Sequence, residues 1–466
     1  MNTWKVILGV LMLVVLGACS SPAITPAPTK ASAVEPTKAP VQPTVAPTAQ
    51  PLAAPIKLTI WSGWPEMQPV YEAAAKWYKE LHPNVTIEFS GFPIREVERK
   101  YAVSLPTKTG PDIVDITGYT AQPQIENGSL LPNPPEVDAF FKSGVYHPLY
   151  VSDSTYQGKT YGIPVLFSIS GMLWNTDMFK EAGLAAPPKT IDEAIEMGKK
   201  LTKTDAQGNV TRSGWGLRLF GGGAGVSSKW WYFVKSAGGD LFEQCTPNST
   251  KYRAGYDNDA GRQVLKMYID VVHKYKIHDP KLKQDAEGFA TQQAAMFVRE
   301  GWLIPYMQKN APTVKFDSGP LPAVKKNNTL LYWTNLVVTN SSKNPKEAWD
   351  FIMFMANGPK LKELERIQLE QVGWLPPRSD LAKRHSDVYT QWPAYKWFAE
   401  APGYELYPYP RVSVTDEVFT KLSERLVAAY GDARLVDNPA GIAKVIKDAA
   451  DETNAILKEN GLYCGQ

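Results

Sequence analysis

The stretch QGKTYGIPVLFSISGMLWNTDMFKEAGLAAPPKTIDEAIEMGKKL, residues 157–201, decides the fold class. It predicts a strand, a turn, a second strand and a short helix that stops at Gly183. Two prolines then separate this unit from a new helix, in which Thr190 and Glu193 have the spacing of a capping box. Strands that alternate with helices in this way indicate an α/β protein.

The residues before this stretch show the same alternation. Apolar residues alternate with polar ones from Ile56 to Ile60 and predict a strand, and apolar residues recur at helical spacing from Val70 to Leu81. HPNVTIEFSG and TGPDIVDITGY then predict a second and a third strand. This β-α-β-α-β order predicts a largely parallel sheet with helices on both faces.

Proline-capped starts mark two helices in the last third of the chain. Asn344-Pro345 and Asn438-Pro439 each place a capping residue before a proline that suits the first helical turn. We expect the first of these helices to stop at Asn357-Gly358-Pro359 and the second near Gly461.

The N-terminus is typical of a bacterial lipoprotein. Lys5 precedes an apolar run, Val6 to Leu16, which is too short to span a bilayer and suits a secretory signal. Leu16-Gly17-Ala18-Cys19 resembles a lipobox, so we expect residues 1–18 to be a signal peptide and Cys19 to carry lipid. An ordinary secreted protein with a chance cysteine is the alternative. Residues 19–55 predict a disordered tether, because Pro22 to Pro55 holds nine prolines and no aromatic residue.

Composition excludes several classes of function. The net charge is +3, with no basic patch, so nucleic acid is not an expected partner. The five histidines show no metal-ligand spacing, and we expect no metal and no cofactor. Gly-x-Ser-x-Gly, His-Glu-x-x-His and Cys-x-x-Cys are all absent from the sequence. Cys245 and Cys464 could form a disulfide outside the cytoplasm or could stay as two thiols.

Several ordered blocks resemble one family. They are LTIWSGW…YEAAAKWYKELHPNVTIEF, TGPDIVDI followed by ENGSLLPN, the block from Gly158 to Ala194, QQAAMFVREGW, VTNSSKNPKEAWDFIMFMA and VGWLPPRSD. Together they are similar to the solute-binding proteins of bacterial ABC importers, extracellular solute-binding protein family 1, most of which bind sugars. Trp174 stands where tyrosine is more usual in that family. The resemblance covers nearly all of residues 56–466.

This resemblance implies a two-lobe, periplasmic-binding-protein-like α/β fold of type II. The N-terminal lobe would comprise residues 56–164 and 325–373, and the C-terminal lobe residues 168–320 and 378–466. The ligand cleft would lie between the lobes, at a hinge formed where the chain crosses between them.

A sugar receptor needs aromatic rings against the C–H faces of its ligand and hydrogen-bonding groups around the hydroxyl rim. Residues of these types lie on loops after predicted strands, beside the glycine-rich stretch GGGAG, and near the crossings. The expected ligand-binding residues are Trp64, Glu66, Tyr119, Thr120, Trp230, Trp231, Trp302, Trp333, Trp374, Arg378, Tyr407 and Tyr409. The resemblance places Trp302 where family members often stack on sugar. One of Trp230 and Trp231 is expected to face the ligand and the other to pack inward.

The resemblance therefore implies a monomeric, lipid-anchored receptor on the outer face of the bacterial cytoplasmic membrane. It would capture a carbohydrate, most simply an oligosaccharide, close around it and deliver it to an ABC permease without catalysing a reaction. Two alternatives remain open. One is a binding protein of the same fold for a non-sugar solute, because fold does not fix the ligand. The other is a surface glycosidase, because paired carboxylates are too common here to exclude.

Overall fold

The computed structural model describes residues 54–247 and 249–464. The predicted signal peptide, lipidated Cys19 and nearly all of the predicted tether lie outside these residues. Within the described ranges, no helix combines the length and the apolar character that a membrane crossing requires.

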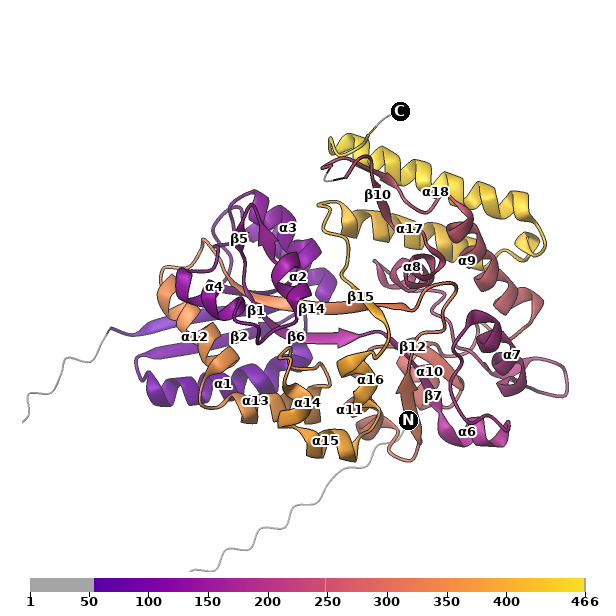
Figure 1. Cartoon of the computed structure of the whole chain (residues 1–466), viewed down its shortest axis with the longest axis horizontal. Helices are drawn as coiled ribbons and strands as arrows, with labels where there is room; N and C mark the ends of the chain where they lie inside the picture. Colours follow the sequence, from indigo (N-terminus) through magenta and orange to yellow (C-terminus); the bar gives the residue numbers. More distant parts are fainter. Residues whose placement is uncertain (1–53, 248, 465–466) are drawn as a thin grey trace, which may run out of the picture. The chain divides into compact units, whose positions relative to one another are not determined.

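The described chain mixes strands and helices along its whole length (Figure 1). Its first part holds β1 (Ile56–Ser62), α1 (Gln68–Leu81), β2 (Val85–Gly91), α2 (Ile94–Ser104), β3 (Ile113–Thr117), α3 (Gly118–Glu126), α4 (Pro135–Phe141), α5 (Pro148–Asp153), β4 (Thr155–Tyr156), β5 (Lys159–Thr160) and β6 (Ile163–Ile169). The middle part holds β7 (Gly171–Asn175), α6 (Thr176–Glu181), α7 (Ile191–Leu201), β8 (Lys203–Thr204), β9 (Val210–Arg212), α8 (Gly225–Ala237), β10 (Phe242–Gln244), β11 (Tyr252–Ala254), α9 (Asp259–Ile269), α10 (Asp285–Ala290), β12 (Met296–Arg299), α11 (Leu303–Asn310) and β13 (Phe316–Gly319). The last part holds β14 (Asn328–Val338), α12 (Pro345–Asn357), α13 (Leu361–Ile367), α14 (Leu381–Arg384), α15 (Ser386–Gln391), α16 (Tyr395–Glu400), β15 (Glu405–Tyr407), α17 (Thr415–Tyr430) and α18 (Pro439–Glu459).

The deciding stretch folds as its pattern predicts, into β6, β7, α6 and α7. The Thr190 hydroxyl accepts a hydrogen bond from the Glu193 backbone N–H at 3.2 Å. The Glu193 carboxylate in turn accepts from the backbone N–H of Lys189 at 2.7 Å, one residue earlier than in the usual capping box. Asn438 caps α18 by accepting from the Gly441 N–H at 2.9 Å, whereas Asn344 makes no side-chain cap bond to α12.

The largest sheet is mixed rather than parallel. β1 pairs in parallel with β2 and β3, as the sequence predicts, but β14 runs antiparallel to both β3 and β6. A second sheet, β12–β7–β13, is antiparallel throughout. β15 pairs in parallel with β14, so the prediction of a largely parallel sheet was wrong for the two pairings that β14 makes with β3 and β6. The reason is that β14 does not follow a crossover helix from a neighbouring strand, as a parallel strand must.

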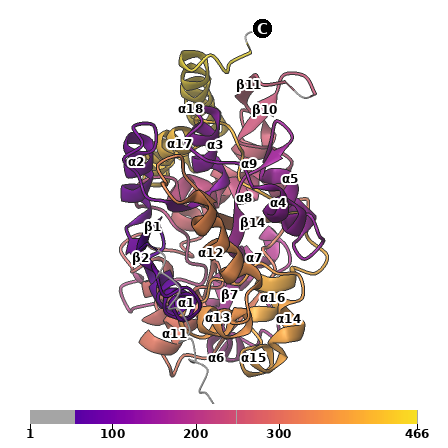
Figure 2. The same cartoon turned by 90° about the vertical axis from the view of Figure 1, so that its left-hand side faces the viewer.

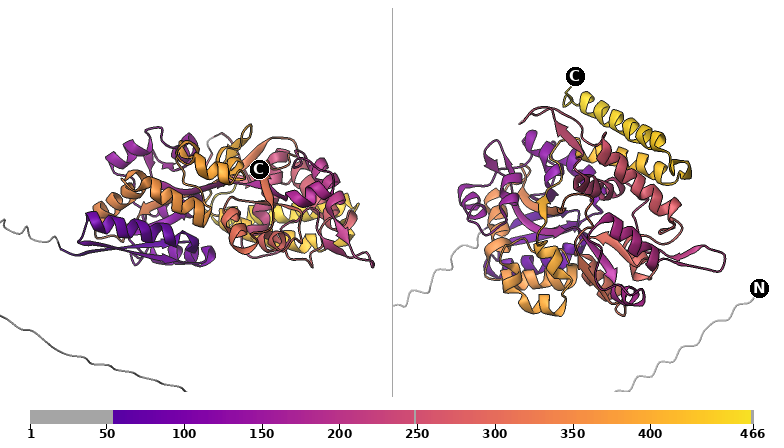
Figure 3. Two further views of the ribbon diagram at one scale, coloured as in Figure 1. Left: turned by 90° about the horizontal axis from the view of Figure 1, so that it is seen from below. Right: turned by 45° about the vertical axis from the view of Figure 1, so that its right-hand side comes forward.

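Buried side chains form two hydrophobic cores. The first core includes Leu58 and Ile113 of the largest sheet, and the second includes Trp215 and Tyr256. Helices α8, α9, α17 and α18 contact one another around the second core, and α17 and α18 are the yellow helices of Figure 3. Each core joins segments that lie far apart in the sequence, so neither could form from one continuous half of the chain.

The chain passes between the cores along two adjoining strands. Leu330 of β14 belongs to the second core, and the next residue, Leu331, belongs to the first. On the neighbouring strands, Ile169 at the end of β6 belongs to the first core, and Met172 in β7 belongs to the second. A third passage follows α14–α16, whose buried residues from Leu381 to Ala401 join the first core before Tyr407 joins the second. The lobe limits given above stay a prediction, because the first core also includes residues such as Phe289 and Leu303 from the segment predicted for the C-terminal lobe.

Two aspartates, Asp115 buried and Asp112 half-buried, connect the first strands through hydrogen bonds. Ser62 Oγ and Tyr71 Oη each donate to the Asp115 carboxylate at 2.8 Å. The Asp112 carboxylate accepts from the backbone N–H and the hydroxyl of Thr59, both at 2.9 Å. Burial raises the pKa of Asp115 to about 6, although Tyr71 and Ser62 hydrogen bonds oppose this rise.

Cys245 and Cys464 are joined as a disulfide, with their Cα atoms 6.3 Å apart. Backbone pairing surrounds them, because the Cys464 N–H donates to the Tyr252 carbonyl at 3.2 Å and the Cys245 N–H to the Lys251 carbonyl at 3.3 Å. The bond links the β10–β11 hairpin to the segment that follows α18.

Removing this disulfide should destabilise the second core. We expect Cys245→Ser, Cys464→Ser and reductant to lower the free energy of unfolding alike, by about 2–5 kcal/mol, because the bond closes a long loop in the unfolded chain. Urea unfolding measures this loss. Unchanged midpoints in all three samples would show that the two thiols are not joined in the purified protein.

Asp115→Asn should change the pH dependence of stability. The folded protein holds the Asp115 proton up to about pH 6, against a reference pKa of 3.8, so wild type loses stability as pH rises between these values. Across this window we expect the free energy of unfolding of Asp115→Asn to rise by about 2–3 kcal/mol relative to that of wild type. Above the window the difference should stay constant. Urea unfolding at several pH values tests this, with the exposed Asp177→Asn as a matched control. A difference that shrinks with rising pH would contradict it.

Candidate functional site

A cavity of about 640 Å³, here called the central cavity, lies between the two cores. Its aromatic lining consists of Tyr119, Tyr232, Tyr332, Trp374, Tyr409 and Phe419. Its charged lining consists of Arg95, Arg218, Lys229, Arg299 and Glu300. Ala224, Gly225 and Ser228, at the start of α8, and Ile94 complete it. Both cores contribute, since Trp374 belongs to the first and Tyr232 to the second.

Tyr409 is the centre of the aromatic wall. Its ring stacks on Trp231, with centroids 5.6 Å apart and planes 18° apart. It meets Tyr119 and Tyr332 edge to face, at 5.5 and 5.9 Å. Its hydroxyl lies 3.3 Å from that of Tyr232. Burial raises the pKa of all four lining tyrosines, so their phenols stay protonated and can donate hydrogen bonds at neutral pH.

Trp374 extends this wall at the first core. Its ring is tilted against Tyr332 with centroids 5.5 Å apart, and its indole N–H donates to the Glu66 carboxylate at 2.8 Å. Trp64 supports Tyr332 from behind, at 6.2 Å between ring centroids. The arrangement offers flat apolar rings with hydrogen-bonding groups at their edges, which is the chemistry that a ring-shaped, hydroxyl-rich ligand requires.

Charged side chains from α8 and from the end of β12 line another part of the cavity wall. Lys229 Nζ forms an ion pair with Glu300, and both side chains are only 8% exposed. Burial would raise the pKa of Glu300, but Lys229 and Arg299 outweigh it and lower that pKa to about 2. Burial lowers the pKa of Lys229 to about 8, which leaves the ammonium mostly charged at neutral pH.

An ion-pair bridge joins α2 to α17. Arg95 pairs with Glu98 at 2.7 Å and also with Asp416, at the start of α17. Tyr119 Oη donates to the same Glu98 at 3.1 Å. Figure 2 shows α2, α3 and α17 close together, and α3 contacts α17 directly. This bridge connects elements of the two cores beside the cavity.

The glycine-rich loop makes room for two arginines. A Cβ added at Gly223, where φ is +63°, would lie 2.6 Å from Arg95 Nε, and one at Gly225 would lie 2.7 Å from Arg218 Nη2. The absence of side chains at these two glycines therefore lets the arginine side chains approach the backbone at the cavity wall.

The structure brings together about half of the sequence-predicted residues. Tyr119, Trp374 and Tyr409 line the central cavity. A second group supports that lining from behind: Glu66 and Trp64 as described, Trp231 under Tyr409, and Thr120, whose hydroxyl donates to Glu98 at 3.4 Å.

The remaining five predicted residues lie elsewhere. Trp230 is fully buried in the second core against Tyr256, and Tyr407 is buried there beside Trp231. Neither Trp230 nor Trp231 lines the central cavity, so their burial does not favour the expectation that one of them faces the ligand, which stays a prediction. α8 is buried on nearly every side, and its tryptophans pack inward.

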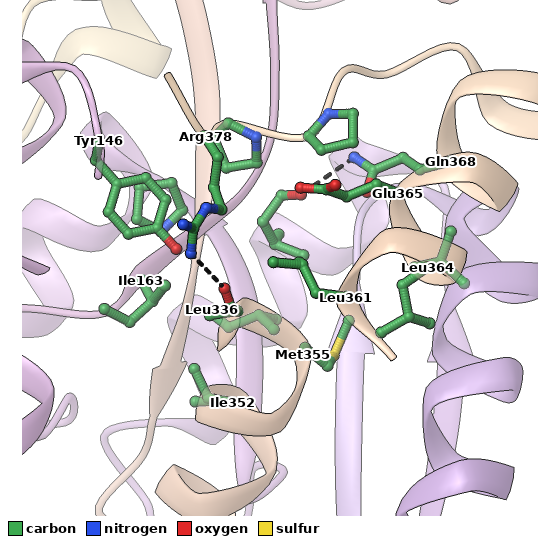
Figure 4. A pocket seen from close by; sticks show the side chains of 16 residues that line it. Tyr146, Ile163, Leu336, Ile352, Met355, Leu361, Leu364, Glu365, Gln368 and Arg378 are labelled. Atoms are coloured by element: carbon green, nitrogen blue, oxygen red, sulfur yellow. Dashed lines mark hydrogen bonds between the residues drawn. The ribbon is translucent and has the colours of Figure 1, made fainter. Parts of the chain in front are cut away.

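Trp302, Trp333 and Arg378 also fall outside the central cavity. Trp302 packs under the Arg299 guanidinium at 4.9 Å, and Trp333 meets Tyr150 at 5.0 Å in the first core. Arg378 lines a different, mainly apolar cavity, where its guanidinium donates to the Ala356 carbonyl at 3.4 Å (Figure 4). That cavity lies within the first core and includes Ile352 and Leu364, which gives it the character of a packing void.

Sequence reasoning missed all five charged residues of the lining and two of its tyrosines. The missed residues are Arg95, Arg218, Lys229, Tyr232, Arg299, Glu300 and Tyr332. One signal was available: Lys229 opens the run KWWYF, and a lysine within so apolar a helix needs a buried partner. That partner, Glu300, lies 71 positions away, and no local pattern connects the two. No group of three metal-binding side chains is found in the described part of the chain.

Comparison with known proteins agrees with this architecture. A binding protein of Brucella abortus is 22% identical over 421 residues, which cover 87% of this chain and 93% of the relative. The arabinooligosaccharide-binding protein of Halalkalibacterium halodurans is 23% identical, over 70% of this chain and 72% of the relative. An ABC substrate-binding protein of Listeria monocytogenes, solved in complex with cycloalternan, superposes with a TM-score of 0.72. It is 17% identical and covers 87% of this chain and 99% of its own.

The fold is accordingly the two-lobe α/β fold of periplasmic binding proteins, with the central cavity at the boundary of its two cores. The family model for bacterial extracellular solute-binding proteins matches residues 73–396, well over half of the chain. This protein belongs to the family of bacterial extracellular solute-binding proteins and acts outside the cytoplasm.

Proposed function

We propose that this protein captures a carbohydrate, most simply an oligosaccharide, and delivers it to an ABC permease. The observation that carries the proposal is the aromatic wall of the central cavity, with Tyr409 at its centre. Stacked rings suit the C–H faces of sugar rings, and protonated phenols suit their hydroxyls. The ligands named for the Halalkalibacterium and Listeria proteins are saccharides, which supports the same reading.

Capture would work by closure of one lobe on the other. A ligand favours the closed form only if it contacts both lobes. The cavity meets this condition, because Trp374 comes from the first core and Tyr232 from the second. Contacts such as Arg95 with Asp416 would then form on closing and hold the ligand until the permease receives it. In this proposal the protein acts as a monomer and catalyses no reaction.

Carbohydrate capture can be tested by isothermal titration with neutral and acidic mono- and oligosaccharides, peptides and polyamines. We expect heat with at least one saccharide, and Trp374→Ala should weaken that binding by about 10–100-fold through loss of a stacking ring. Trp374→Phe keeps an aromatic ring, so it should lose less saccharide affinity than Trp374→Ala. Trp77→Ala, on α1 away from the cavity, is the matched control. Binding of only peptides or polyamines, or release of product from chromogenic glycosides, would refute the proposal.

Lipid on Cys19 would hold the protein at the outer face of the cytoplasmic membrane. Two or three acyl chains anchor a protein stably, because each buried methylene contributes about 0.8 kcal/mol. We expect the full chain, expressed in bacteria, to enter the detergent phase on Triton partition and Cys19→Ser to stay in the aqueous phase. Equal partition of the two would show that this cysteine carries no anchor.

A further inference from the structure

The charged side of the central cavity holds more cations than carboxylates. The charge cluster, defined here as Arg218, Lys229, Arg299, Asp285 and Glu300, contains three cations and two carboxylates, and its side chains are 8–26% exposed. Arg218 and Arg299 share Asp285, at 3.0 and 2.7 Å. Lys229 and Arg299 share Glu300, the latter at 3.2 Å. One positive charge is therefore left without a carboxylate of its own.

Such a surplus is costly in a folded protein. A buried cation that lacks a full counter-charge is destabilising by several kcal/mol unless something else compensates it. Arg218 also has an Nε–H that is buried without a hydrogen-bond partner. The three cations all line the cavity, whereas Asp285 does not. The uncompensated charge therefore faces the space that a ligand would fill.

A helix terminus adds to the positive potential at the same place. α8, 13 residues long, begins at Gly225, and its first turn contains no acidic residue. Ala224 provides no side-chain cap, and Ser423 Oγ accepts from only one first-turn N–H, that of Ser227, at 3.0 Å. Unpaired N–H groups and the helix dipole make such a terminus attractive to anions. Because Gly225 has no side chain, the Arg218 guanidinium lies directly against this first turn. Two independent sources of positive potential thus meet at one end of the cavity.

The first-core side chain nearest the cluster does not cancel this surplus. Arg95 lines the cavity against the same glycine-rich loop as Arg218, and its partners Glu98 and Asp416 lie outside the lining. Burial raises the pKa of Glu98 to about 7, although Arg95 opposes the rise, so this carboxyl is partly protonated near neutral pH. The lining as a whole carries four cations and one carboxylate.

We propose that the ligand is an anionic saccharide whose acidic group, a carboxylate or a phosphate, binds between Arg218, Lys229 and the start of α8. Its sugar rings would lie along the wall formed by Tyr232, Tyr409 and Trp374. Arg218 supplies a planar donor pair suited to either anion, and its buried Nε–H gains the acceptor it lacks. This inference rests on the proposed carbohydrate capture and specifies which class of carbohydrate the cavity takes.

Matched ligands test the inference with the full chain. The probes are uronate oligosaccharides with their neutral methyl esters, and sugar phosphates with their unphosphorylated sugars, each titrated calorimetrically. We expect at least one acidic member to bind at least ten-fold more tightly than its neutral partner, with affinity falling as salt rises toward about 1 M, where the Debye length shrinks to about 3 Å. The two pairs of probes distinguish a carboxylate ligand from a phosphate ligand.

Other outcomes separate this inference from the proposed function. If neutral sugars bind as tightly as their acidic partners, carbohydrate capture stands and the anionic ligand is overturned. If no saccharide of either kind binds, carbohydrate capture itself fails.

Substitution at the cluster gives a second test. Arg218→Gln should lower the affinity for the acidic ligand by at least ten-fold and the affinity for its neutral partner by much less. Arg218→Lys keeps the charge, so its affinity for the acidic ligand should lie between those of wild type and Arg218→Gln. Because Arg218→Gln removes the surplus charge, its melting temperature without ligand should not drop. Arg253→Gln, an exposed arginine paired with Glu243 on the β10–β11 hairpin, is the matched control. If Arg218→Gln lowers the affinities for the acidic and the neutral ligand by the same factor, the proposal is overturned.

Discussion

The pairing of β14 with β6 is the constraint on which the rest of the structure depends. β14 is a single strand of eleven residues, and it passes from the second core at Leu330 to the first at Leu331. β6 runs beside it in the opposite direction and leads into β7. β14 is continuous through the boundary, and beside it the chain crosses where β6 leads into β7, so backbone joins the two cores at this place. Figure 1 shows the two strands between the cores.

The cavity follows from this arrangement. Tyr332 lies on β14 two residues beyond the change of core and packs against both cores, so one side chain contacts Trp374 on one side and Tyr409 on the other. Rings from remote segments can gather only because β14 delivers Tyr332 to the boundary. The charge cluster is positioned independently, by α8 and by the end of β12. Different elements therefore supply the stacking rings and the charged groups of the cavity. Such a lining suits a ligand that has both apolar ring faces and a charged group.

Burial decides what the charged groups can do. Lys229 and Glu300 are buried in the cavity lining, where each shifts the pKa of the other in the direction that favours its charged form. The same low polarity makes the surplus of Arg218 costly in the empty protein and useful to a bound anion. The glycines of the loop before α8 matter for the same reason, because any larger side chain at Gly225 would push the guanidinium away from the helix terminus.

The sequence by itself determined the strand and helix order of residues 157–201, the cap at Thr190, and the aromatic residues Tyr119, Trp374 and Tyr409 of the site. The strand and helix order follows from side-chain periodicity, and the three aromatic residues, which line the central cavity, were named from their loop positions and the family resemblance. Only the tertiary structure decided the antiparallel course of β14, the inward packing of Trp230 and Trp231, and the meeting of Lys229 with Glu300. Each of these depends on segments distant in sequence that come together when the two cores form, and no spacing along the chain encodes such a contact.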